Sequence, residues 1–278
     1  MARDDTPLGS FLRSRREKVD AASAGIVDHT RRRVRGLRRE ELALLAGISP
    51  SYYTRLEQGR DRNPSREILE ALARTLGLDD TERAYLWSLA APSLTPAQPD
   101  MATSRTVRSG VEYLLHRWRD LPAFVVSPRR DVLAGTDLAA RVNPAWNAGR
   151  NLIEFTFLDP RARQVYPDWK DITLQAVAGL RATAAARRPE VDALVADMRA
   201  QSGTFRALWD SHDVYDRVMG QKRIAVDGAG VLRLDFETFA LAGSEGHVLY
   251  VYFGAPTSPD ERKLDELARS MQSPDSPR

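Results

Sequence analysis

The sequence predicts two domains, an all-α N-terminal domain and an α+β C-terminal domain. Within residues 1–90, apolar residues recur with helical spacing in five short segments, each bounded by turn or capping residues. Within residues 108–278, alternating apolar and polar residues near both ends flank a mostly helical middle, which is typical of an α+β sheet domain. Residues 91–107 are rich in Pro, Ser and Thr and are predicted to be a linker.

The composition indicates a globular protein and excludes several classes. The chain has 278 residues, of which 42% are hydrophobic and 28% charged. No apolar run is long enough to span a bilayer, and the first residues lack the apolar core of a secretory signal. The absence of cysteine excludes disulfides, thiolate zinc sites and cysteine nucleophiles. We therefore expect a cytoplasmic protein with no membrane partner.

Positive charge is concentrated in one segment of the predicted helical domain. The net charge of the whole chain is only +3, and arginine abundance alone says little. Residues 31–66, however, hold ten arginines against four acidic residues, a local charge of +6. Such a patch is the expected electrostatic footprint of a phosphate-binding face.

The five helical segments have recognisable boundaries. The first, in residues 8–19, places Leu8, Phe11 and Leu12 on one face. "LRREELALLAG" is a compact helix that ends at Gly47, a residue suited to a left-handed C-terminal cap. Ser49 is then expected to cap the next helix, with Pro50 as its first residue. Segments beginning at Ser65 and at residue 81 complete the set.

Residues 38–58 have the pattern of a helix-turn-helix. Ala43 is small enough for close helix contact, and Gly47 allows a tight turn between the helices. The predicted buried set is Leu42, Ile48, Tyr53 and Leu56. Burying that set turns Ser51, Tyr52 and Arg55 outward at the start of the second helix, which in this motif enters the major groove of DNA.

The candidate DNA contacts are of two kinds. For bases we expect Pro50, Ser51, Tyr52 and Arg55, with Arg55 able to make a bidentate contact to guanine. Basic residues around the motif are expected on the phosphate backbone, because guanidinium groups and helix N-termini attract phosphate. This second set is Arg31, Arg32, Arg33, Arg35, Arg38, Arg39, Arg60, Arg62 and Asn63.

This stretch resembles the Xre family of prokaryotic repressor-like helix-turn-helix domains over about residues 8–78. "EELALLAGISPSYYTRLEQG" contains the E-L-A, G-[IV]-S and L-E-x-G landmarks in register. The resemblance implies a structural pair between Glu57 and an arginine of the first helix, which would be Arg16. The loop at residues 20–36 is longer than is usual in the family, and it is strongly basic.

The C-terminal part is predicted to contain strands at "PAFVVS", "DVLAG", "VLRLDFETFAL" and "HVLYVYFGA", with a hairpin turn at "AGSEG". Helices are expected between the second and third of these, and "PDERKLDELARSM" is expected to form a final helix. With the stretches "RNLIEFTFLDPRARQVYPDW" and "LVADMRAQSGTFRALWDSHDV", residues 108–270 resemble the ligand-binding region of MmyB-like regulators.

The resemblance implies a PAS-type fold and a fatty-acid-like ligand. The chain departs from the family at Gly135-Thr136, where Trp-Asn is usual, and at "IAVDGAG", where His-Pro often occurs, so the ligand is not inherited directly. Aromatic residues are numerous enough for a subset to line an apolar pocket, although each can equally be a core residue. The pocket candidates are Phe124, Phe155, Phe157, Trp169, Phe205, Arg206, Trp209, Phe236 and Tyr252.

No pattern supports catalysis. The four histidines are scattered without metal-ligand spacing, and neither a nucleophile elbow nor a P-loop is present. We expect a non-enzymatic regulator without a cofactor, which binds double-stranded operator DNA as a homodimer and responds to a small apolar or fatty-acid-like ligand. An alternative is a DNA-bound adaptor that recruits another protein and takes no small-molecule ligand.

Overall fold

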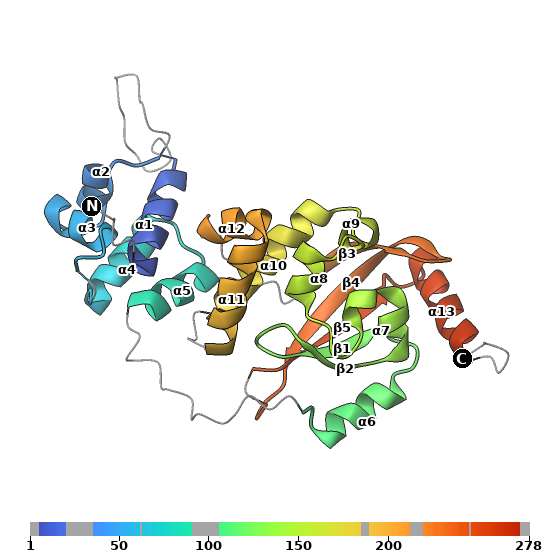
Figure 1. Cartoon of the computed structure of the whole chain (residues 1–278). Helices are drawn as coiled ribbons and strands as arrows, with labels where there is room; N and C mark the ends of the chain where they lie inside the picture. Colours follow the sequence, from blue (N-terminus) through green and yellow to red (C-terminus); the bar gives the residue numbers. More distant parts are fainter. Residues whose placement is uncertain are drawn as a thin grey trace. The chain divides into compact units, whose positions relative to one another are not determined.

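A computed structural model describes residues 6–20, 36–61, 63–90, 106–184, 189–211, 219–244 and 246–272 (Figure 1). The chain divides into two compact units, formed mainly by residues 1–97 and 98–278. Each unit is described by itself.

The first unit is a bundle of five helices whose starts are set by capping side chains. The Thr6 hydroxyl accepts a hydrogen bond from the Gly9 amide, and the Ser49 and Ser65 hydroxyls do the same for the helices that follow them. Pro occupies the first positions of two helices, where a missing amide hydrogen costs nothing. The helices are α1 (Pro7–Lys18), α2 (Arg39–Leu45), α3 (Pro50–Glu57), α4 (Arg66–Thr75) and α5 (Asp80–Ala90).

Apolar residues from all five helices form the core of this unit. Phe11 and Leu12 of α1 and Tyr53 and Leu56 of α3 are fully buried. The Phe11 ring meets that of Tyr85 edge-on, with centroids 5.2 Å apart, and so joins α1 to α5. The helices therefore depend on tertiary packing, since each is too short to be stable alone.

The second unit is built around a five-stranded sheet in the order β2-β1-β5-β4-β3, with every neighbouring pair antiparallel. The helices lie mainly between the second and third strands in the sequence, so the unit has the α+β architecture expected for a PAS-type fold. Its strands are β1 (Ala123–Val126), β2 (Val132–Gly135), β3 (Met219–Val226), β4 (Gly230–Ala240) and β5 (Val248–Gly254).

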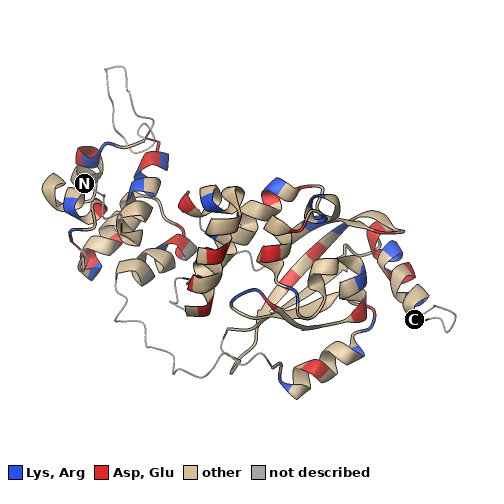
Figure 2. Ribbon diagram, in the orientation of Figure 1, with Lys and Arg blue, Asp and Glu red and all other residues tan. Residues whose placement is uncertain are grey.

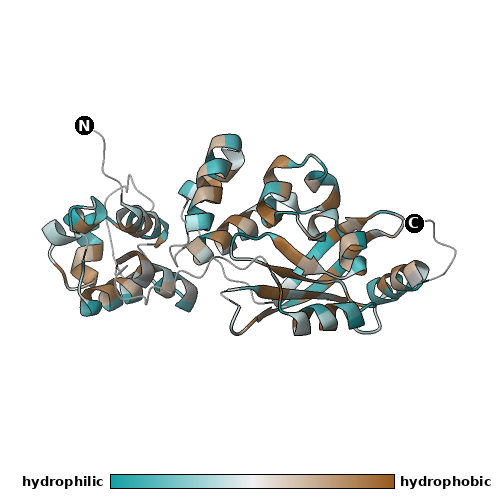
Figure 3. Cartoon of the chain, turned by 60° about the horizontal axis from the view of Figure 1, so that its bottom comes forward, coloured by the Kyte–Doolittle hydropathy of each residue, from teal (hydrophilic) through white to brown (hydrophobic). Residues whose placement is uncertain are grey.

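One face of the sheet, here called the inner face, packs on helices and forms the main core. Its side chains include Phe124, Leu234, Phe236 and Tyr252, all at most 4% exposed. Figure 3 shows the largely apolar character of these strands. The helices are α6 (Ser109–Arg117), α7 (Asp137–Val142), η1 (Pro144–Trp146), α8 (Leu152–Leu158), α9 (Ala162–Val165), α10 (Trp169–Ala184), α11 (Pro189–Gln201), α12 (Gly203–Asp210) and α13 (Pro259–Gln272).

The opposite face, here called the outer face, is covered in part by α6. Val111 and Leu115 of this helix are buried against Val125 of β1 and Leu249 of β5. Leu241 at the end of β4 also packs on this cluster. The sheet thus has apolar side chains on both faces at β1 and β5, as expected of a central strand pair.

The predicted elements are largely confirmed, with one strand missed. The four predicted strands match β1, β2, β4 and β5, and the final helix matches α13. The strand β3 was not predicted and pairs with β4 over eight residues. Gly135-Thr136 is one of the two places where the chain departs from the family pattern. A Cβ atom added at Gly135 would lie 3.1 Å from the Phe124 Cβ, and the Thr136 hydroxyl caps α7. Residues 21–35 and 91–105, most of the basic loop and of the predicted linker, lie outside the described residues.

We predict that Gly9→Ala destabilises the helical unit by about 1–3 kcal/mol. A Cβ at this position would lie 2.4 Å from the Glu57 carbonyl oxygen, because α1 packs directly on the end of α3. Helix propensity alone predicts the opposite sign, a gain of about 0.5–1 kcal/mol. Thermal unfolding followed by circular dichroism measures the difference. Gly110→Ala in α6 is the matched control, since nothing lies within 4 Å of its new Cβ, and it should not lower stability.

Candidate nucleic-acid interface

The helices α2 and α3 are joined by the tight turn that the sequence predicts. Gly47 adopts a φ of +69°, in the left-handed region, and the Ile48 amide donates to the Ala43 carbonyl at 3.0 Å. Ser49 then caps α3 through its hydroxyl, which accepts from the Tyr52 amide at 3.2 Å. This geometry fixes the start of α3 and the direction in which its first residues point.

The first turns of α3 separate side chains into a buried and an outward set. Tyr53 and Leu56 are fully buried, as predicted, whereas Pro50, Ser51 and Arg55 are exposed and Tyr52 is half-buried. The two adjacent tyrosines therefore have different environments. An exposed row of this kind at the N-terminal end of the second helix has the placement that base recognition requires.

Arg55 is held by two neighbours. Its Nη2 lies 3.4 Å from the Asp61 carboxylate, and its guanidinium carbon lies 5.4 Å from the centroid of the Tyr52 ring. Partial burial, with a smaller contribution from Asp61, raises the pKa of Tyr52, so its hydroxyl stays protonated at neutral pH. Asp61 was not among the predicted site residues, because an acidic residue in a basic loop gives no sequence signal for pairing with Arg55.

The predicted phosphate contacts are only partly within the described residues. Arg38, Arg39, Arg60 and Asn63 are all exposed near the ends of α2 and α3. Figure 2 shows basic residues on these helices. Five further candidates, Arg31, Arg32, Arg33, Arg35 and Arg62, lie outside the described residues.

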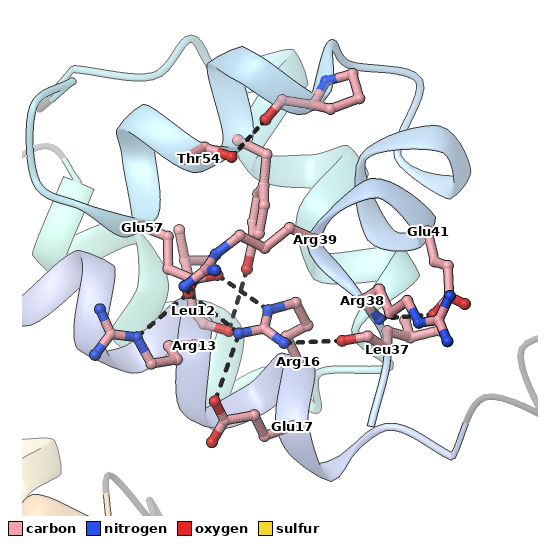
Figure 4. A network of polar contacts seen from close by, with 12 residues as sticks. Leu12, Arg13, Arg16, Glu17, Leu37, Arg38, Arg39, Glu41, Thr54 and Glu57 are labelled. Atoms are coloured by element: carbon pink, nitrogen blue, oxygen red, sulfur yellow. Dashed lines mark hydrogen bonds and ion pairs between the residues drawn. The ribbon is translucent and has the colours of Figure 1, made fainter. Parts of the chain in front are cut away.

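Behind this surface, one buried carboxylate binds three arginines (Figure 4). Glu57, at the end of α3, is fully buried. Arg16 donates to both of its oxygens, from Nε at 3.0 Å and from Nη2 at 3.1 Å, which confirms the pair implied by the family resemblance. Arg13 donates from Nε at 3.3 Å, and Arg39 donates from Nη2 at 2.7 Å and from Nε at 3.0 Å. The network therefore joins α1, α2 and α3.

Burial alone would raise the pKa of Glu57, but hydrogen bonds and charge from Arg16 and Arg39 outweigh it and lower the pKa. Burial likewise disfavours the charged form of Arg16, yet Glu57 raises its pKa overall. Both groups stay ionised in the folded state. A buried charge with several hydrogen-bonding partners is strongly destabilising to disrupt, because removal of one side leaves the other unpaired.

Arg39 therefore occupies a different position from the one expected for a purely phosphate-bound side chain. Its guanidinium is bonded to Glu57, while 45% of its side chain remains exposed. This contact was not predicted from the sequence, because Arg39 and Glu57 lie on different helices that are separated by the turn. A phosphate contact by Arg39 remains a prediction, and it would have to be made by the exposed part of the group.

The predicted pocket residues of the second unit fall into two clusters and do not form one set. Phe124, Phe155, Phe236 and Tyr252 belong to the inner-face core, with Trp169 packed against it. Phe205 belongs to a separate cluster between α8, α10, α11 and α12, with Phe157 and Trp209 packed against it. Arg206 is exposed and donates to the Arg199 carbonyl at 2.9 Å.

On the inner face the rings stack on one another. Phe124 lies 4.9 Å from Trp146 and 5.4 Å from Tyr250 between centroids, and Trp146 lies 4.2 Å from Tyr252. The Lys222 amino group, absent from the predicted set, lies 5.0 Å from the centre of the Phe236 ring. The inner face thus combines a ring cluster with a cation at its β3 side.

Comparison with known families accounts for both units. A family model described as "MmyB-like transcription regulator ligand binding domain" matches residues 107–267, and a helix-turn-helix domain model matches residues 7–86. The chain belongs to the MmyB-like transcription regulators. It is a DNA-binding regulator with a helix-turn-helix domain and a ligand-binding domain. No curated protein matches this regulator significantly.

Two further features hold for the described residues of the regulator. None of the helices within them is both long and apolar enough to cross a membrane. Across the same parts of the chain, no group of three or more His, Asp or Glu side chains is arranged to hold a metal ion.

We predict that Glu57→Gln costs about 3–5 kcal/mol of unfolding free energy at pH 7, because Arg16 would lose its buried counter-ion. The folded-state pKa of Glu57 lies below its ordinary value of 4.5, so its contribution is present above about pH 4.5 and is lost as the pH falls through the folded-state pKa. The difference between wild type and variant should therefore shrink in acid. Denaturant unfolding at a series of pH values measures it, and a difference independent of pH would contradict the role of the carboxylate charge.

Proposed function

We propose that the protein is a sequence-specific regulator that binds a two-half-site operator as a homodimer and changes its DNA affinity when a small apolar ligand binds the C-terminal domain. The observation that carries the DNA part is the outward row of the exposed Ser51 and Arg55 and the half-buried Tyr52, on a helix anchored by the Glu57 network. A rigidly held helix keeps such side chains in a single register on the base edges.

In this proposal Arg55 reads a guanine through its two terminal nitrogens. Asp61 and the Tyr52 ring restrict the orientation of its guanidinium before DNA binds, which lowers the entropy lost on binding. Pro50 and Ser51 lie nearest the groove floor, and Tyr52 contacts a thymine methyl group or a sugar. Arg38, Arg39, Arg60 and Asn63, with the basic residues of 31–35 and Arg62, contact phosphates.

Two copies are needed because one short helix reads few bases. The few base contacts of a single α3 discriminate poorly between DNA sequences. A second copy related by two-fold symmetry doubles the number of base pairs that are read. Half-site spacing then follows from the separation of the two helices in the dimer.

The ligand is proposed to be a small apolar or fatty-acid-like molecule that contacts the inner-face aromatics. The match to a ligand-binding family and the concentration of rings around Phe124 and Tyr252 support this assignment. The main alternative is an adaptor role, in which the C-terminal unit recruits a protein and its core takes no ligand. Native mass spectrometry of the purified chain separates the two. A co-purified lipid-sized mass favours the ligand, whereas a bare chain that gains no mass on incubation with fatty acids favours the adaptor.

We predict that Arg55→Ala lowers discrimination at one base pair of each half-site by about 1–3 kcal/mol. Arg55 is exposed, and its side-chain contacts to Asp61 and to the Tyr52 ring lie at the surface, so the variant should fold normally. Fluorescence anisotropy with operators mutated one base pair at a time would measure the effect. Equal loss of affinity for every sequence, with discrimination unchanged, would show that Arg55 contacts only the backbone.

Arg60→Ala is the matched variant for a residue that is proposed to contact phosphate and not a base. We expect it to weaken binding to specific and non-specific DNA alike and to reduce the slope of log K against log salt by about one. Arg39 is unsuited to this comparison because it also binds Glu57, so its loss would change stability and binding together. Anisotropy titrations between low and high salt give the slopes. Wild-type binding without any sequence preference would overturn the proposed function itself.

A further inference from the structure

The outer face of β4 has an ordered row of side chains. Inner-face residues Leu232, Leu234 and Phe236 are buried, and the residues between them point to the outer face. That outer row consists of Val231, Arg233, Asp235, Glu237 and Phe239. Figure 2 shows acidic and basic residues along this sheet.

Both ends of the row are apolar and exposed. Val231 is 43% exposed and is paired only with β3, and Phe239 is 52% exposed and is paired only with β5. Phe239 is paired in register with Leu249, which packs on α6, and α6 itself exposes Tyr113 and Leu114.

The charged residues within the row are not neutralised by one another. Arg233 is directly opposite Arg223 on β3, a like-charge pair that disfavours the sheet. Arg223 instead forms an ion pair with Asp168, in which the Arg223 Nη1 lies 3.1 Å from the Asp168 carboxylate. In the described part of the chain, neither Arg233 nor Glu237 forms an ion pair, so each retains an unmatched charge.

The row is complementary to itself when reversed. About Asp235 as the centre, Val231 corresponds to Phe239, and Arg233 corresponds to Glu237. In a two-fold interface, residue i of one copy contacts residue j of the other, and j contacts i. A second copy laid antiparallel over β4 would therefore match apolar with apolar side chains and would form two identical Arg–Glu pairs.

From this pattern we infer that the outer face of β4 and β3 binds the same face of a second copy of this chain. The partner is another copy because the charge sequence of the strand matches its own reverse. The inference rests on the proposed homodimeric function and names its contact surface. The contact is confined to β4 and β3, because α6 covers part of the outer face at β1 and β5 in each copy. Strands that pack face to face cross at about 30°, which keeps residues two positions from the axis within reach of their partners.

At the centre of the proposed interface, two like charges repel each other, and their removal provides a second test. Asp235 lies next to the two-fold axis, so two carboxylates face each other there. Each is partly compensated, since the Gln221 side-chain amide donates to Asp235 at 2.9 Å. Removal of this charge should therefore strengthen the dimer, whereas most interface substitutions weaken it.

The test is the dimer dissociation constant of the full chain, measured by sedimentation velocity over a dilution series. We expect the wild type to be dimeric, and Arg233→Glu or Glu237→Arg each to raise Kd by about tenfold or more, because each change creates two like-charge contacts. The double variant Arg233→Glu/Glu237→Arg should return Kd to within a few-fold of wild type. Arg150→Glu, an exposed charge reversal away from this row, is the control and should leave Kd unchanged.

Asp235→Asn should lower Kd several-fold. Circular dichroism melting of every variant distinguishes loss of the interface from loss of the fold. The inference is overturned if the wild type is monomeric, if the single reversals leave Kd unchanged, or if the double variant is no tighter than the singles. A monomeric wild type would also overturn the proposed homodimer, whereas a dimer whose Kd does not respond to the reversals overturns only this contact surface. DNA binding and the base discrimination that depends on Arg55 are measured separately.

Discussion

The helical unit depends on the ionised, buried carboxylate of Glu57. Burying a carboxylate is unfavourable unless hydrogen bonds replace its hydration, and here donors come from arginines on two other helices. Arg16 also donates to the Leu37 carbonyl at 2.8 Å, which ties the segment before α2 to α1. Together with the turn at Gly47 and the buried Tyr53 and Leu56, this group holds α3 and sets the direction of its outward residues.

The same network also supplies positive potential. Three arginines bind Glu57, and Arg16 also lies 3.5 Å from the partly exposed carboxylate of Glu17, so the arginines outnumber the carboxylates of the network by one. The partly exposed Arg39 and Arg13 are the members through which this charge reaches solvent. The Glu57–Arg16 pair implied by the family resemblance thus includes, in this chain, a partly exposed arginine of α2.

The sequence predicted the helical unit well because its landmarks are local. Gly47, Ser49 and Pro50 act on neighbouring residues, and the burial of Tyr53 follows from helical periodicity. The strand β3 was missed because Lys222 stands on its inner face and interrupts the apolar alternation, although its amino group lies over the Phe236 ring. The separation of the pocket candidates into two clusters could not be predicted, since it depends on how α10–α12 pack and not on any spacing along the chain.

Strand β4 connects the two proposed activities of the C-terminal unit. Phe236 faces the aromatic core, and its neighbours Asp235 and Glu237 stand on the outer face. The inner rings are in contact with one another, so a ligand that enters this core has to displace ring contacts and shift β4 or β5. A ligand changes dimerisation only if it binds one arrangement of the strand more tightly, and dimerisation then changes ligand affinity by the same factor. Ligand and second copy would thus act on opposite faces of one strand, and the alternation in residues 231–239 gives that strand the means to couple them.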